Sequence, residues 1–153
     1  MAVLKTTPER QLKGFIDKFD PRNRTLIRAV RRALRGIFPT AFELVYDNYN
    51  FLAIGYGPNE RTSECVVSLA AAANGVGLCF IRGAGLPDPK RILLGSGNQT
   101  RFIRLESAAV LRRPEVRALL KAAVARSKTP FPGAGRVRLV IRSVSAKQRP
   151  RRR

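Results

Sequence analysis

Residues 65–81, CVVSLAAAANGVGLCFI, carry a strong signal for the fold. The Asn74-Gly75 pair at their centre is typical of two-residue hairpin turns, because both residues tolerate the positive φ that such turns require. The apolar segments on either side, residues 65–72 and 76–81, have the length and composition of strands. This stretch therefore predicts an antiparallel hairpin.

Strand-like segments continue on both sides of this hairpin. Residues 43–46 and 49–56 are separated by the turn-favouring pair Asp47-Asn48, and a second turn is expected at residues 57–60. Residues 100–106 form a fifth strand-like segment after the hairpin. Consecutive strands joined by short turns favour an antiparallel sheet of about five strands.

Helical periodicity flanks the strands at both ends. Residues 8–18, 20–38 and 114–125 place apolar side chains on one side of a helix. Asp20 followed by Pro21 is a typical helix start, and Pro39 ends that helix. The predicted fold class is α+β, a two-layer sandwich whose antiparallel sheet is covered by N-terminal and C-terminal helices.

The C-terminal part has a different composition. We assign residues 1–128 to the α+β domain and residues 129–153 to a Pro/Gly linker, a short extra strand and a basic tail. Alternation over residues 137–141 predicts the strand. Residues 143–153 are expected to be disordered in isolation, because they have few apolar groups to offset the entropy of ordering.

Composition excludes several functions. The chain has 153 residues, 44% of them hydrophobic, and no histidine, so histidine-dependent nucleophile activation and metal ligation are absent. Cys65 and Cys79 lack metal-ligand spacing and fit buried free thiols. With no catalytic constellation, we expect neither an enzyme nor a cofactor. No signal-peptide or membrane-span pattern is present, which favours a cytoplasmic location. Nothing in the sequence specifies an oligomeric state.

The charge balance indicates an anionic partner. Thirty basic against ten acidic side chains give a net charge of +20, and residues 126–153 hold ten of the basic groups and no acidic one. A field of this size attracts nucleic acid or another polyanion. A GC-rich coding bias toward arginine would produce the same composition without a binding role.

Arginines recur on one side of the helix predicted over residues 20–38, opposite its apolar side. They form either a ridge that follows phosphates or a solvated face with carboxylate partners from other segments. With the tail, the candidate polyanion-binding residues are Arg24, Arg28, Arg31, Arg35, Arg136, Arg138, Arg149, Arg151, Arg152 and Arg153.

Two further groups of residues suggest other ligands. Glu43 and Asp47 share a face of the predicted strand and could bind a hard cation through oxygen, do acid–base work if one pKa is raised, or offset neighbouring arginines. Tyr46, Tyr49 and Arg82 are candidates for a small-molecule pocket, although aromatic residues on short strands are more often part of a core.

Several motifs resemble those of the domain-of-unknown-function 1801 family, also called YdhG-like proteins. Pro39, Glu43 and the run 45–49 are similar to its Pro–Glu–aromatic segment, and residues 86–89, 94–97 and 100–105 are similar to its loop and final sheet strand. The similarity covers roughly residues 9–125. It implies a compact sandwich similar to frataxin, and some members of the family are described as intracellular iron chaperones.

This chain departs from the iron-binding pattern that the resemblance implies. Iron would use carboxylates on the first helices, whereas residues 20–39 hold arginines and only the capping carboxylate of Asp20. We therefore expect a non-enzymatic binding domain for a polyanion such as nucleic acid. A frataxin-like iron carrier and a small-molecule-binding domain are the alternatives.

Overall fold

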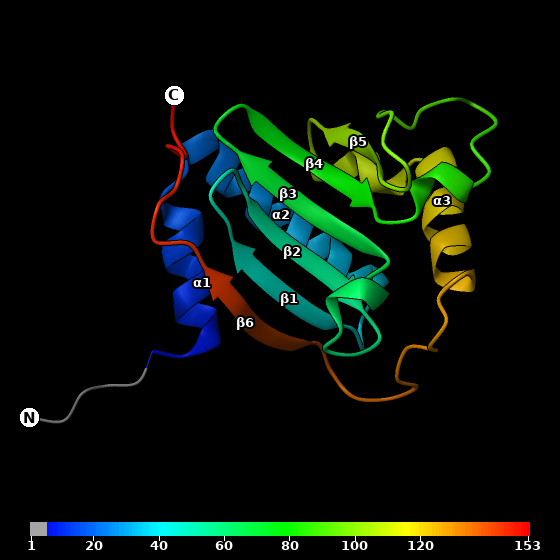
Figure 1. Cartoon of the computed structure of the whole chain (residues 1–153), viewed down its shortest axis with the longest axis horizontal. Coiled ribbons are helices and arrows are strands. Elements are labelled where there is room, and N and C mark those ends of the chain that lie inside the picture. The colour runs from blue at the N-terminus through cyan, green and yellow to red at the C-terminus, as the bar shows by residue number, and fades with distance from the viewer. Residues whose placement is uncertain (1–5) are drawn as a thin grey trace, which may run out of the picture.

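The helical and strand-like segments form three α-helices and a six-stranded sheet in the computed structural model, which describes residues 6–153 (Figure 1). The α+β class predicted from the sequence is confirmed. The helices are α1 (Pro8–Asp17), α2 (Pro21–Ile37) and α3 (Pro114–Ala125). The strands are β1 (Phe42–Asp47), β2 (Leu52–Gly57), β3 (Val67–Ala72), β4 (Gly75–Phe80), β5 (Arg101–Leu105) and β6 (Arg138–Val144).

Turn chemistry determines the central part of the sheet. The predicted hairpin is present as β3 and β4, but Ala72 and Gly75 pair across the turn, so its two turn residues are Ala73 and Asn74, one position earlier than the predicted Asn74-Gly75 pair. Gly75 has a φ of 142°, a conformation that favours glycine. Strands β1 to β5 are each antiparallel to the next, in the order β5-β4-β3-β2-β1-β6.

The sixth strand makes the sheet mixed, which corrects the expectation of a purely antiparallel sheet of about five strands. After α3 the chain returns to the opposite edge, where β6 runs parallel to β1 with Phe42 opposite Arg138 (Figure 1). The register shifts between Val45 and Tyr46, so β6 contains a bulge there. The extra strand predicted at residues 137–141 is thus part of the same sheet as the rest.

The tail beyond β6 is ordered, and the expectation of disorder over residues 143–153 is wrong. The side chain of Arg151 is buried and donates to Asp47 Oδ1 at 3.0 Å and to the carbonyl oxygen of Asn48 at 2.5 Å. Its Nε has no hydrogen-bond partner among residues 6–153, so the cost of burying the guanidinium is only partly offset. The Arg152 guanidinium donates to the carbonyl of Lys18. A buried carboxylate therefore holds a segment that has few apolar groups of its own.

The helices leave one face of the sheet without a helical cover. Figure 1 shows α2 behind the sheet, with α1 at one side of it and α3 at the opposite side. The core lies between sheet and helices and includes Ile27 and Val30 of α2, Leu119 of α3 and Ile54 of β2. None of the helices within residues 6–153 is long and apolar enough to cross a membrane.

The Arg151–Asp47 contact should contribute strongly to stability. Replacing Arg151 by Ala leaves the fully buried Asp47 with Lys18 and Gln148 as side-chain partners. We expect the free energy of unfolding in urea to fall by about 3 kcal/mol, the lower end of the range for breaking a buried ion pair. Arg153→Ala, two residues further along and exposed, is the control and should change it by less than about 0.5 kcal/mol. Equal urea midpoints for the two variants would contradict this role of Arg151.

Candidate functional site

Arg24, Arg28, Arg31 and Arg35 lie on the polar side of α2 and are here called the α2 stripe. Two of them, Arg31 and Arg35, bind a buried carboxylate. Glu43 of β1 is fully buried and accepts from Arg31 Nε at 2.9 Å and from Arg35 Nη2 at 2.8 Å. Glu9 of α1 accepts from both arginines at 2.9 Å, and Tyr56 donates its hydroxyl to Glu43 at 2.6 Å. Of the two interpretations of the stripe, a ridge that follows phosphates and a face with carboxylate partners from other segments, the second is correct for Arg31 and Arg35.

Glu9, Arg31, Arg35, Glu43 and Tyr56 form a group that we call the Glu43 cluster. Its two arginines balance the charge of its two carboxylates. Burial by itself would raise the pKa of Glu43, but the hydrogen bonds from Arg31 and Arg35 outweigh it and hold that pKa below its usual value. Burial and the adjacent Glu43 carboxylate raise the pKa of Tyr56 well above its usual value. Glu43 is therefore a carboxylate, and Tyr56 a neutral hydroxyl, at neutral pH.

The N-terminal half of the stripe is more accessible. Arg28 Nη2 lies 2.8 Å from Asp17 Oδ1, and both side chains are partly exposed, so this pair is a surface ion pair. Arg24 makes no ion pair within residues 6–153 and lines a hollow with Lys13 and Arg28. Only this end of the α2 stripe can offer positive charge to a partner.

Glu43 and Asp47, the candidate cation ligands, are each surrounded by basic side chains. Both are fully buried, and Asp47 accepts from Lys18 Nζ at 2.6 Å as well as from Arg151. Burial would raise the pKa of Asp47, but its hydrogen bonds lower it overall. Within residues 6–153 no three His, Cys, Asp or Glu side chains are grouped so as to hold a metal ion. A cation here would have to displace these ion pairs.

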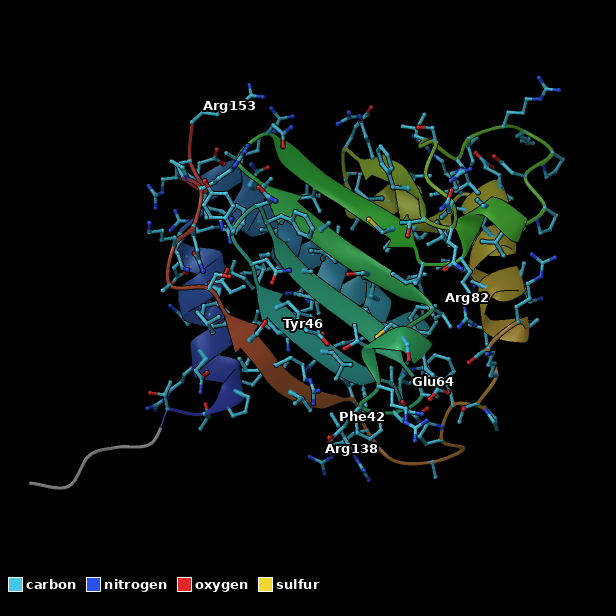
Figure 2. The ribbon with its side chains drawn as sticks, in the orientation of Figure 1. Phe42, Tyr46, Glu64, Arg82, Arg138 and Arg153 are labelled. Atoms are coloured by element: carbon cyan, nitrogen blue, oxygen red, sulfur yellow. The ribbon has the colours of Figure 1, made fainter. Side chains whose placement is uncertain are left out.

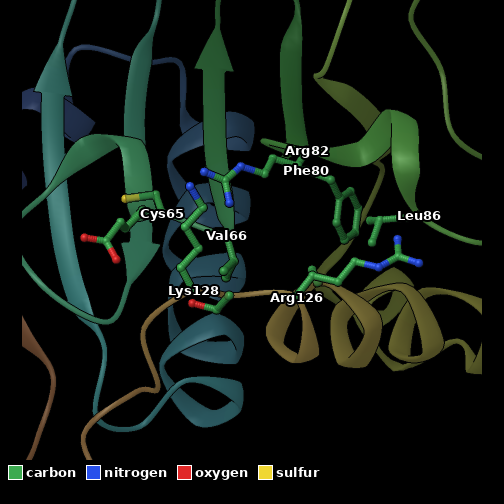
Figure 3. A pocket seen from close by; sticks show the side chains of 10 residues that line it. Cys65, Val66, Phe80, Arg82, Leu86, Arg126 and Lys128 are labelled. Atoms are coloured by element: carbon green, nitrogen blue, oxygen red, sulfur yellow. The ribbon is translucent and has the colours of Figure 1, made fainter.

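The candidate pocket residues Tyr46, Tyr49 and Arg82 do not meet. The Tyr46 hydroxyl contacts Thr62 Oγ1 in the 3₁₀ turn η1 (Thr62–Glu64), while Tyr49 lies in the turn between β1 and β2. Arg82 instead lines a hollow of about 30 Å³ with Lys128, and both side chains point into its mouth (Figure 3). That volume accommodates roughly two water molecules.

The tail arginines divide into two groups. Arg151 and Arg152 are engaged with β1 and α1, as described above, so neither is free to follow a polyanion. Arg136, Arg138, Arg149 and Arg153 are exposed. The guanidinium of Arg149 lies 5.6 Å from the centre of the Tyr49 ring, which is itself 49% exposed.

The sheet face opposite the core, which we call the uncovered face, combines small residues on the middle strands with larger residues on the outer ones. Cross-strand pairing places Tyr46, Ala53, Ala70, Gly77 and Arg104 in one row across five strands. A second row contains Leu44, Gly55, Ser68, Cys79 and Phe102. Because the side chains on the middle strands are short, the middle of this face is recessed relative to its two sides.

Glycine is required where η1 approaches this face. A Cβ on Gly55 would lie 2.9 Å from the Sγ of Cys65, and one on Gly57 would lie 3.0 Å from the Cα of Cys65. Cys65 is buried against these strands, and burial raises the pKa of its thiol to about 11. The segment after η1 thus covers one end of the uncovered face, and Ala70 and Gly77 remain partly accessible.

Arginines lie over aromatic rings on both sides of the uncovered face. Arg138 of β6 lies 5.3 Å from the ring centre of Phe42 on β1, and the two are adjacent in Figure 2. Arg104 lies 6.0 Å from the ring centre of Phe102 on β5. Both arginines are exposed. No residue of the described strands that points to this face is acidic, because Glu43 and Asp47 point to the helices.

Sequence reasoning named Arg138 but missed Phe42, Phe102 and Arg104. The signal for Arg104 and Phe102 is their alternation with Ile103 and Leu105, which are buried in the core. Phe42 alternates in the same way with Glu43, but a glutamate gives no indication of a core-facing position unless its arginine partners are known.

The Glu43 cluster predicts a pH dependence of stability. A carboxylate with a lowered pKa stabilises the fold above its unfolded pKa, near 4.5, and this contribution is lost as the pH falls through the folded pKa. Glu43→Gln should therefore lower the free energy of unfolding by roughly 3–5 kcal/mol at pH 7. The difference from wild type should shrink at pH 3.

Urea denaturation of both proteins at the two pH values tests this prediction, with exposed Glu60→Gln as the control that keeps wild-type stability at pH 7. A Glu43→Gln deficit of the same size at pH 3 and pH 7 would show that the charge of Glu43 does not carry the effect.

Comparison of the chain with protein-family models, curated proteins and solved structures finds no match. The resemblance to the domain-of-unknown-function 1801 family therefore stays a prediction, and functional inference rests on the side chains described above.

Proposed function

We propose that this protein is a binding domain for single-stranded nucleic acid, which it contacts with the uncovered face of its sheet. The observation that carries the proposal is the pairing of exposed arginines with aromatic rings on the strands at both sides of that face. Unpaired bases stack on aromatic rings and on guanidinium planes, while basic side chains neutralise the phosphates.

Charge complementarity supports a polyanion over an apolar partner. The chain carries a net charge of +20, and the strand residues that point to the uncovered face include no carboxylate. Arg104 and Arg138 stand on opposite sides of the small middle residues, across a strand order of β5-β4-β3-β2-β1-β6. With about 4.8 Å between neighbouring strands, the six strands span roughly 24 Å, enough for several nucleotides of an extended strand.

The distribution of engaged arginines favours this face over the α2 stripe. Arg31 and Arg35 hold the buried Glu43, so a phosphate that recruited them would leave that carboxylate without its partners. Arg104 and Arg138 make no ion pair within residues 6–153 and are available without such a penalty. Single strands also suit an aromatic surface better than duplexes, whose bases are already stacked.

Salt-dependent binding distinguishes the two surfaces. Fluorescence anisotropy with labelled 12-nucleotide single strands of RNA and DNA, and with a duplex, should show tighter binding of the single strands. Arg104→Gln with Arg138→Gln should reduce the magnitude of the slope of log K against log salt by about 1.4, because each single-strand phosphate contact contributes about 0.7.

The matched control is Arg24→Gln with Arg28→Gln, which removes the same charge from the α2 stripe at the expense of one surface ion pair. We expect its slope to stay close to that of wild type. A larger loss in this variant than in the sheet variant, or tighter binding of the duplex than of single strands, would overturn the proposal.

A further inference from the structure

A hollow of about 160 Å³ lies on the uncovered face beside the hairpin turn of β3 and β4. Phe51 forms one wall and is 38% exposed, although aromatic rings of this size are usually more deeply buried. Phe102 and Arg104 of β5 line the other side, with Arg104 nearer to the hairpin turn because it pairs with Gly77. The volume is close to that of an engineered cavity, about 150 Å³, that accepts a benzene ring.

The floor of the hollow is recessed because the residues that pair across its strands have small side chains or none. Ala70 pairs with Gly77, and Ala72 pairs with Gly75. A Cβ on Gly77 would lie 3.2 Å from the carbonyl oxygen of Ile103, so even alanine would be tight there. Phe51 directly precedes Leu52, which pairs with Ala71 beside the hairpin turn. Phe102 pairs with Cys79 further along β4, so the two phenylalanines lie at opposite corners of the shallow floor.

Two polar side chains at the rim can recognise a ring that carries hydrogen-bonding groups. Asn74 is exposed, lines the hollow and makes no side-chain hydrogen bond within residues 6–153, so its donors and acceptor are free. Arg104 adds a positive charge at the opposite wall. A nucleotide can accept hydrogen bonds from both groups and donate one to the Asn74 amide oxygen, whereas an apolar ligand would gain nothing from them and leave them to water.

We propose that this hollow holds one unpaired nucleobase of a bound single strand. The base stacks on Phe51 or Phe102, Asn74 hydrogen-bonds to its edge, and Arg104 contacts the adjoining phosphate. This inference rests on the proposed function, and it adds the prediction that binding depends on a base and not only on the backbone charge.

The test compares two single-stranded probes that differ only in their bases. One is a labelled 12-nucleotide DNA, and the other is a 12-unit abasic deoxyribose-phosphate strand with the same charge. We expect wild type to bind the base-containing strand roughly 5- to 100-fold more tightly, the usual effect of a stacked base. A 2-aminopurine in the DNA should lose fluorescence on binding, as stacked bases do.

Three variants separate stacking from charge. Phe51→Leu and Ala70→Leu, which fills the floor, should both remove most of the preference for bases while leaving the salt slope unchanged. Arg104→Gln should lower the magnitude of the slope by about 0.7 while keeping part of the preference. Urea midpoints identify any variant that has lost the fold, and two independent substitutions at the hollow keep the test decisive if one has.

The outcomes distinguish this inference from the function on which it rests. Equal wild-type affinity for the two strands, or unchanged preference in both hollow variants, would overturn the hollow as a base site while leaving single-strand binding intact. Absence of binding to either strand near physiological salt would overturn the proposed function and this inference with it.

Discussion

The fold depends on the buried carboxylate of Glu43. It links β1 to α2 through Arg31 and Arg35, to β2 through Tyr56, and to α1 through the shared contacts of Glu9. A carboxylate taken out of water is costly unless charged and hydrogen-bonding partners surround it, so these elements must meet in one arrangement. The Glu43 cluster thus fixes how the helical layer sits on the sheet, while apolar burial supplies most of the driving force.

The arginines have different partners on the two sides of the molecule. On the helical side, half of the α2 stripe is engaged with a carboxylate inside the structure, and Asp47 engages Lys18 and Arg151 in the same way. On the uncovered face the arginines lie over aromatic rings, and no strand residue there offsets their charge. Under the proposed function, a polyanion would meet this available charge next to aromatic rings on which bases could stack.

Local patterns predicted the local structure well. The helix start at Asp20 and the hairpin near Asn74 depend on contacts within a few residues. The alternation in β3 and β4 follows from the two faces of a strand, which needs no knowledge of distant residues. Pairing between distant segments was not accessible in this way, because no local signal specifies that Phe42 lies opposite Arg138. The order of the tail was missed for the same reason, since Asp47, 104 residues earlier, binds Arg151.

The position of β6 has a consequence for the order in which the protein acquires its structure during synthesis. β1 and Asp47 belong to the first third of the chain, but their partners are synthesised last. The outer edge of β1 can pair only after residues 138–144 have been made, and Asp47 can bind Arg151 only after that residue has been made. A growing chain can form the β1–β5 meander well before these residues leave the ribosome. During that interval it exposes an unpaired strand edge and a carboxylate that has only Lys18 as a basic partner, so chaperone contacts with the nascent chain would be most useful at β1.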